Sequence, residues 1–161
     1  MQPTLRGELA WCQLFSEPGA GSDLASLTTR ATKVEGGWRI NGHKIWTSSA
    51  HRADYGALLA RTDATAAKHR GIGYFILDMR SEGVDVHPIR QATGDADFNE
   101  VFLTDVFIGD EMLLGEPTGG WDHAIATMAE ERVAIGAYVH NDRTGVLRYL
   151  AAVRTVVDRK W

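Results

Sequence analysis

The sequence has a single cysteine, Cys12, and only four prolines in 161 residues. A lone cysteine excludes an internal disulfide and a zinc site made of cysteines. No apolar run is long enough to cross a bilayer as a helix, and the N-terminal residues lack the layout of a secretory signal. The formal net charge of −4 disfavours nucleic acid, which calls for a basic face. We therefore expect a cytoplasmic protein with no membrane span that does not bind nucleic acid.

Glycine is abundant, and its seventeen copies indicate many tight turns between short strands. Asn41-Gly42 predicts a two-residue hairpin turn, because both residues tolerate positive φ. Strands are expected at residues 9–16, 28–34, 38–40, 43–48, 56–61, 73–78, 84–89 and 99–108. Short strands at this spacing predict a barrel or a sandwich.

The pattern changes near Trp121, where apolar residues begin to recur at helical spacing. Asp122 suits the positive end of a helix dipole. The apolar stripe resumes over residues 146–157, so one kinked helix and a helical hairpin both fit. The predicted fold is mainly β, with a barrel of short antiparallel strands over residues 1–115 and a helical arm over residues 116–161. An amphipathic arm without a partner implies a missing domain, a second chain or a dimer.

Two segments could carry chemistry, and the first is FSEPGAGSD at residues 15–23. Two glycines in three residues let the backbone approach a ligand closely and turn N–H groups toward an anion. A tight surface turn is the alternative, and for an isolated pair of glycines it is the commoner case. The segment is not a Rossmann dinucleotide motif, because the third glycine is missing and no helical pattern follows.

The second segment is NGHKIWTSS at residues 41–49. A tryptophan beside three hydroxyls could offer a flat apolar wall with hydrogen-bonding groups at its edge. Such a wall suits a planar heteroaromatic cofactor. The alternative is a hairpin whose Trp46 lies in the core.

Other groupings are weaker candidates. Six histidines are scattered, and no pair has metal-ligand spacing reinforced by carboxylates, so we expect no metal site. Ser48, His51 and Asp54 are close in sequence, but a hydrolase triad is assembled in space and not along a loop.

The order of the motifs is more specific than either segment alone. SEPGAGSDLA, then INGHKIWTSS, then LLARTD strongly resembles the middle domain of the acyl-CoA dehydrogenases, whose pattern is roughly EPGAGSD followed by NGxKxW. The resemblance continues through GIGYFILD, GVDVHPI, FNEVFLTDVFI and GGW, and covers residues 2–137. It implies a truncated acyl-CoA dehydrogenase fold, FAD as cofactor, an acyl-CoA substrate, an electron-transfer acceptor and a homo- or hetero-oligomer.

The resemblance assigns roles by motif position. Ser16 takes a threonine position near the pyrimidine edge of the flavin, and Ser22 would also touch the acyl-CoA. Trp46 would lie against the flavin ring, while Ser48 would present its hydroxyl to the reactive nitrogen. The full cofactor-binding set is Gln13, Leu14, Phe15, Ser16, Pro18, Gly19, Ala20, Gly21, Ser22, Trp46, Thr47 and Ser48.

The same resemblance makes Glu131 the candidate catalytic base and Arg132 the candidate contact to the substrate's CoA moiety. The glutamate position is that of the branched-chain and long-chain subgroup. From the residues alone, a solvated Glu–Arg pair on a helix is the alternative. The chain has Ala129 where some relatives hold the substrate with an aspartate.

The implied reaction is α,β-dehydrogenation of an acyl-CoA thioester. A carboxylate of raised pKa removes the α-proton, and a hydride leaves the β-carbon for the flavin. Because the helical domains of full-length relatives are missing, we expect a partial enzyme that is inactive alone. Two alternatives are a subunit that works with another chain, and a non-catalytic module that keeps the barrel to bind flavin, CoA or a protein.

Overall fold

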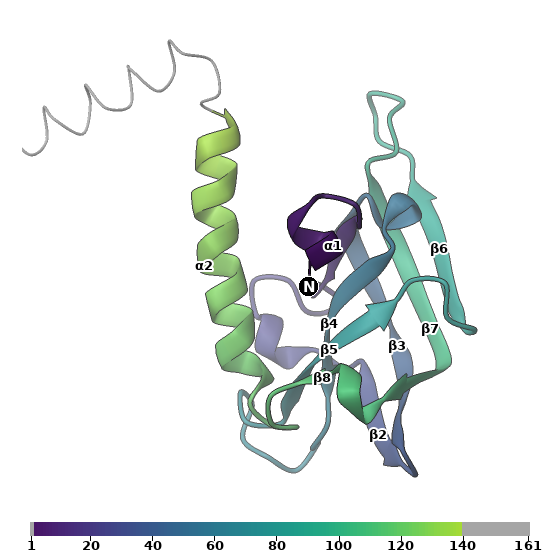
Figure 1. The fold of residues 1–161 in the computed structure, drawn as a ribbon, viewed down its shortest axis with the longest axis vertical. Coiled ribbons are helices and arrows are strands. Elements are labelled where there is room, and N and C mark those ends of the chain that lie inside the picture. The colour runs from purple at the N-terminus through teal and green to yellow at the C-terminus, as the bar shows by residue number, and fades with distance from the viewer. Residues whose placement is uncertain (1, 140–161) are drawn as a thin grey trace, which may run out of the picture. The chain divides into compact units, whose positions relative to one another are not determined.

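The computed structural model describes residues 2–139 (Figure 1). Its backbone divides after Ala124 into two units. Three single-turn 3-10 helices, η1 (Leu24–Ser26), η2 (Ala50–Arg52) and η3 (Asp110–Met112), lie between longer elements. Those longer elements are α1 (Gln2–Leu5), β1 (Trp11–Leu14), β2 (Arg30–Val34), β3 (Gly37–Ser48), β4 (Tyr55–Arg61), β5 (Ile72–Asp78), β6 (Val84–Ile89), β7 (Phe98–Gly109), β8 (Leu113–Leu114) and α2 (Gly120–Val139).

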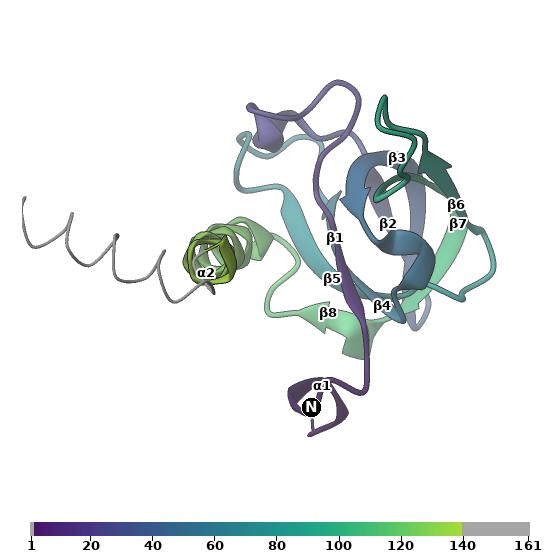
Figure 2. The same ribbon diagram turned by 90° about the horizontal axis from the view of Figure 1, so that it is seen from above.

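The strands form one sheet in the order β6-β7-β3-β2-β4-β5-β8, with β1 added in parallel to β4. Most neighbours are antiparallel, and the sheet curls around its own apolar face (Figure 2). The long pair β3 and β7 carries two β-bulges. Bulges increase the local twist and so help a sheet to curve. The predicted class, mainly β followed by a C-terminal helix, is confirmed over the described residues.

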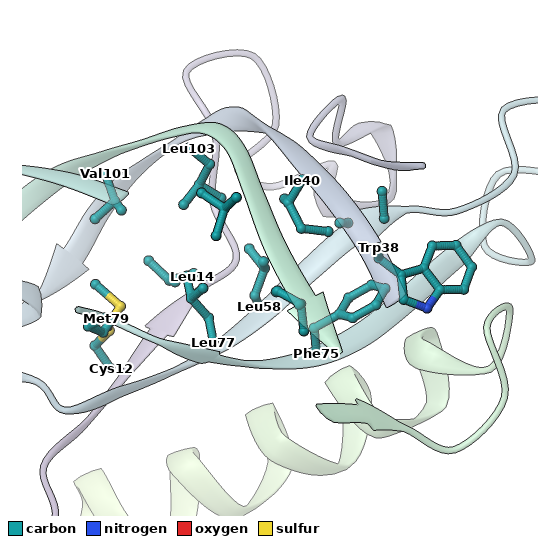
Figure 3. Close-up of a cluster of buried hydrophobic side chains, with 14 of the residues drawn as sticks. Cys12, Leu14, Trp38, Ile40, Leu58, Phe75, Leu77, Met79, Val101 and Leu103 are labelled. Carbon is teal, nitrogen blue, oxygen red and sulfur yellow. The ribbon is translucent and has the colours of Figure 1, made fainter. Parts of the chain in front are cut away.

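The core lies inside the curled sheet (Figure 3). Leu14, Leu58, Phe75 and Leu77 are fully buried there, and Trp38 meets the ring of Phe75 edge to face at 5.6 Å between ring centroids. Burying one such side chain contributes about 1.5–3 kcal/mol. This core makes the sheet a rigid support for the ends of β1 and β3, which carry the candidate site.

The predicted hairpin at Asn41-Gly42 is wrong. The chain turns earlier, at Glu35-Gly36, where Gly36 has a φ of +73°, and β3 then runs without interruption from Gly37 to Ser48. Pairing with β2 on one side and β7 on the other overrides the local preference of Asn-Gly for a turn. Gly42 serves a different purpose, because a Cβ there would lie 2.3 Å from the Thr29 Oγ1.

Asn41 marks the first bulge of β3 and β7. Ile40 pairs with Val106 but Gly42 pairs with Leu103, so β7 carries the extra residue. Asp105 takes it up with a φ of 51° and donates its backbone N–H to the Asn41 Oδ1 at 2.9 Å.

The other expected elements agree closely with the structure. The strands predicted at 56–61, 73–78, 84–89 and 99–108 are confirmed as β4, β5, β6 and β7, while β1 and β2 are shorter than predicted. Neither α1 nor β8 was expected. The helix beginning near Trp121 is confirmed as α2.

Two of the sequence predictions fall in the C-terminal part of the chain. The apolar stripe at residues 146–157 lies outside the described residues. The domain division into 1–115 and 116–161 stays a prediction. Among residues 2–139, no helix combines the length and apolar character needed to span a bilayer.

Candidate functional site

The two segments singled out in the sequence meet where β1 ends and β3 nears its own end. The Ile45 N–H donates to the Ser16 carbonyl at 3.0 Å, and the Lys44 ammonium donates to the Phe15 carbonyl at 3.0 Å. These bonds fix residues 15–16 against residues 44–45, although the segments are far apart in sequence. The two segments that the sequence analysis placed in one site are therefore neighbours in the fold, and their joint role stays a prediction.

A buried ion pair joins the same segments. The Lys44 Nζ lies 2.8 Å from the Glu17 Oε1, with Lys44 fully buried and Glu17 only 5% exposed. The Glu17 carboxylate also accepts hydrogen bonds from the Thr28 N–H and hydroxyl, both at 2.7 Å, and from the Thr29 N–H at 2.9 Å. Charges buried this deeply persist only when paired and hydrogen-bonded, as both are here.

The pair shifts the pKa of each partner. Burial alone would raise the pKa of Glu17, but the Lys44 ammonium and the hydrogen bonds from Lys44 and Thr28 outweigh burial and hold it at about 2. Burial lowers the pKa of Lys44 to about 8, even though Glu17 favours its charged form. At neutral pH both groups are charged, so the contact is an ion pair.

The lowered pKa of Glu17 predicts a loss of stability in acid. Its folded pKa of about 2 lies below the reference value of 4.5, so the contribution is complete above pH 4.5 and is lost as the pH falls toward 2. The shift corresponds to about 3 kcal/mol. Denaturant unfolding between pH 6 and pH 2 should show this slope, and Glu17→Gln should flatten it. The exposed Glu35→Gln is the matched control, and an equally steep slope in Glu17→Gln would contradict the assignment.

A second β-bulge decides where Trp46 points. Lys44 pairs with Val101 and Thr47 pairs with Asn99, so Ile45 and Trp46 together oppose the single residue between those two on β7. Strict alternation along a strand would place Trp46 on the same face as the buried Lys44. The bulge breaks that alternation, and both Lys44 and Thr47 are buried.

Trp46 is consequently an exposed aromatic residue in a strained backbone conformation. Its φ is 61° and the residue is 59% exposed, and its ring meets that of Phe98 edge to face at 6.2 Å between ring centroids. The alternative that placed Trp46 in the core is wrong. A left-handed conformation for a bulky residue costs about 1–3 kcal/mol, and such strain gathers at functional sites.

The three hydroxyls after Trp46 do not share one environment. Ser48 and Ser49 are exposed, whereas Thr47 is buried. Among the described residues, the Thr47 Oγ1 has no hydrogen-bond partner. The exposed hydroxyl nearest to Trp46 along the chain is therefore that of Ser48, the one that the family resemblance assigned to the flavin's reactive nitrogen.

The glycine-rich segment forms a tight turn. The Glu17 N–H donates to the Ala20 carbonyl at 2.9 Å and the Ala20 N–H returns to the Glu17 carbonyl at 3.0 Å, with Pro18 and Gly19 between them. A Cβ at Gly19 or Gly21 would meet nothing within 4 Å, so this chain leaves both positions open to close approach.

The remaining predicted cofactor contacts differ in what they expose. Leu14, Phe15 and Ala20 are buried, so only their backbone could face a ligand. Gln13 and Ser16 are half-buried, and Pro18, Gly19, Gly21 and Ser22 are exposed.

Asn99 of β7 holds the bulge from the opposite side. It is fully buried, and its side-chain amide donates to the Thr47 carbonyl at 2.9 Å. Its Oδ1 lies 2.9 Å from the His51 Nδ1. The Ser49 N–H donates to the carbonyl of Asp97, the residue before β7, at 2.8 Å. Both neighbours of Ser48 are thus anchored, Thr47 to Asn99 and Ser49 to Asp97.

Sequence reasoning missed Glu17, Lys44 and Asn99 as parts of the site. A signal was available for the first two, since opposite charges stand inside both motifs, one in EPGAGSD and one in NGHKIW. Asn99 had no such signal, because its role depends on the register between β3 and β7.

Two weaker candidates can be resolved from the contacts. His51 bonds Asn99, and Asp54 bonds the Arg80 guanidinium and the Ala10 N–H, so Ser48, His51 and Asp54 form no triad. Within residues 2–139, no group of three His, Cys, Asp or Glu side chains could hold a metal ion.

Glu131 and Arg132 lie on α2, beyond the division of the chain after Ala124. Both side chains are exposed. Their roles as base and CoA contact stay predictions.

Comparison with known proteins agrees with the motif order. The family described as "Acyl-CoA dehydrogenase, middle domain" matches residues 12–106. The acyl-CoA dehydrogenase FadE34 of Mycobacterium tuberculosis is 54% identical over 149 residues, which cover 91% of this chain and 21% of that protein. A solved structure named Tcur3481-Tcur3483 steroid ACAD has a TM-score of 0.81 at 33% identity and covers 99% of this chain and 40% of its own.

A third relative is the ChsE4-ChsE5 complex from Mycobacterium tuberculosis. It has a TM-score of 0.73 at 34% identity, and the match covers 79% of this chain and 32% of the solved chain. The chain thus spans two fifths or less of the relatives described here. Over that span the agreement in sequence, fold and motif order is sufficient to conclude that the chain belongs to the acyl-CoA dehydrogenase family, of which it carries the middle domain.

Proposed function

We propose that the chain forms the flavin-binding face of an FAD-dependent acyl-CoA dehydrogenase, which oxidises an acyl-CoA thioester to its α,β-unsaturated form. The observation that carries the proposal is Trp46, exposed and strained at a bulge that the Ile45–Ser16 bond joins to the glycine-rich turn. An exposed indole beside hydroxyls and open backbone suits a planar, phosphate-bearing cofactor.

The residues present fit FAD in three respects. The Trp46 indole offers an aromatic surface for the ring, and the hydroxyls of Ser16 and Ser48 offer hydrogen bonds at its edge. The open positions Gly19 and Gly21 admit close approach to the cofactor's polar part. Bound FAD would supply the acceptor for the hydride that leaves the substrate.

The proton step is assigned to α2. We propose that the Glu131 carboxylate removes the α-proton of the thioester and that Arg132 binds the CoA moiety. A bound acyl chain would exclude water from Glu131, so that its carboxylate meets the α-proton in an apolar site. Ser22, exposed beside the glycine-rich turn, is the proposed second contact to the substrate.

The reaction belongs to a larger assembly than this chain, which covers two fifths or less of the described relatives. Equilibrium dialysis of the folded chain against FAD tests the flavin half of the proposal. We expect saturable uptake of one FAD per chain, because both flavin segments are present and joined. A folded chain that takes up no FAD would contradict it and favour a non-catalytic module.

A hetero-oligomer is the second candidate. One related structure is described as the ChsE4-ChsE5 complex, and another carries the paired name Tcur3481-Tcur3483. Under this proposal another chain completes the flavin and substrate sites. Co-expression should then yield a complex that retains FAD through gel filtration, whereas the chain alone would lose it.

A further inference from the structure

The bulge that exposes Trp46 is supported by buried polar groups on both sides. Upstream, Lys44 is anchored to the Phe15 carbonyl at 3.0 Å and to the Glu17 carboxylate at 2.8 Å. Downstream, the Asn99 amide donates to the carbonyl of Thr47, the residue after Trp46, at 2.9 Å. Lys44 and Asn99 are both fully buried, so each contact is made away from competing water.

These contacts oppose an alternative pairing of β3 with β7 in which the bulge at Trp46 is absent. A left-handed tryptophan is unfavourable, and it persists only where its surroundings over-determine it. If the extra residue of β3 were released, β3 and β7 could pair without a bulge at this point. A shift of one residue moves side chains to the opposite face of a sheet, which would turn Trp46 inward.

Lys44 and Asn99 hold different parts of the backbone of β3. Lys44 fixes the backbone before the bulge by holding residues 15–17, and its neighbour Ile45 adds the bond to the Ser16 carbonyl at 3.0 Å. Asn99 fixes the backbone after the bulge and is itself oriented by His51, whose Nδ1 lies 2.9 Å from the Asn99 Oδ1. Neither side chain is exposed, so neither can touch a cofactor directly.

We propose that Asn99 and Lys44 are positioning residues that hold the β-bulge in the register which keeps the Trp46 indole exposed for flavin. The consequence for flavin rests on the proposed function, whereas the consequence for Trp46 itself does not. Loss of either group should bury the indole and, through it, weaken FAD binding.

The first measurement needs no cofactor. The full chain is labelled with 5-fluorotryptophan, and the fluorine resonance of Trp46 is identified by its loss in Trp46→Phe. Its solvent isotope shift between H2O and D2O reports exposure of the indole. We expect the exposed shift in the wild type, and a shift toward the buried value in Asn99→Leu, which keeps side-chain volume but removes the amide donor.

Asn41→Leu is the matched control, because Asn41 supports the other bulge of the same strand pair through the Asp105 N–H. It should leave the Trp46 resonance unchanged. For Lys44 the test uses the double variant Glu17→Gln/Lys44→Met, which removes both charges together and so avoids an unpaired buried carboxylate. Far-UV circular dichroism and a melting curve confirm that each variant is folded at the temperature of the measurement.

The second measurement adds FAD. The dissociation constant should rise about tenfold in Asn99→Leu and in the double variant, and stay within about twofold in Asn41→Leu. The visible circular dichroism of the bound flavin should change in the first two, a signature that loss of stability alone would not produce.

The two measurements test the positioning role of Asn99 and Lys44 separately from the proposed binding of FAD. Folded Asn99→Leu and double variants with a wild-type Trp46 resonance would overturn the positioning role, whatever FAD does. A wild-type chain whose Trp46 is exposed but which binds no FAD would overturn the proposed function, and the fluorine measurement would still decide the positioning role.

Discussion

Replacing Lys44 by methionine is expected to lower the free energy of unfolding by about 3–5 kcal/mol. The substitution leaves the Glu17 carboxylate buried at 5% exposure with its nearest cation gone. It also removes the bond to the Phe15 carbonyl that joins the end of β1 to β3. Because a domain of this size is stable by only about 5–15 kcal/mol, the loss is a large fraction of the total.

Chemical denaturation with linear extrapolation measures this loss. Lys33→Met is the matched control, since Lys33 pairs with Asp110 at 2.7 Å on the surface, with both side chains about half exposed. That pair should be worth about 0–1 kcal/mol. The double variant Glu17→Gln/Lys44→Met should recover part of the loss. If Lys44→Met lowered the free energy of unfolding no more than Lys33→Met does, the substitution would not have left Glu17 as an unpaired buried charge.

Replacing Glu131 by glutamine in the assembled enzyme is expected to lower turnover by about 10²–10⁴-fold while FAD remains bound. Glutamine keeps the shape of the side chain but cannot accept the α-proton. The neighbouring Glu130→Gln is the matched control, because Glu130 is also exposed on α2 and points about 100° away around the helix.

Steady-state turnover with an acyl-CoA substrate, together with the flavin absorbance of each variant, measures the effect. Turnover that is unchanged in Glu131→Gln would remove Glu131 as the base. Equal losses in both variants would point to damage to α2 instead of a lost proton acceptor.

The fold was largely predictable because its strands follow a local signal. The pattern of apolar residues between turn-forming residues located β4, β5, β6 and β7 to within about one residue. The same reasoning failed at Asn41-Gly42, where a strong turn preference lies inside β3. Pairing on both sides of β3 decides that position, and such non-local pairing leaves no trace in a short window of sequence.

The site was only half predictable for a related reason. The motifs identified which segments come together, and the bonds from Lys44 and Ile45 explain why they do. The orientation of Trp46 followed from neither motif, because alternation along a strand predicts a buried residue there. The exposure of Trp46 depends on one extra residue in β3 relative to β7. Asn99, which supports this bulge by its bond to the Thr47 carbonyl, is far from Trp46 in sequence.

The exposed Trp46 is the proposed aromatic surface for flavin. The most direct test is an FAD titration of the chain and its Trp46→Ala variant, followed by quenching of flavin fluorescence. Phe107→Ala is the control, since Phe107 is an exposed ring of β7 whose partner Arg39 lies about 20 Å along β3 from Trp46. We predict that Trp46→Ala weakens FAD binding about tenfold or more, while Phe107→Ala binds as the wild type does. Equal FAD affinity in all three proteins would contradict the claim.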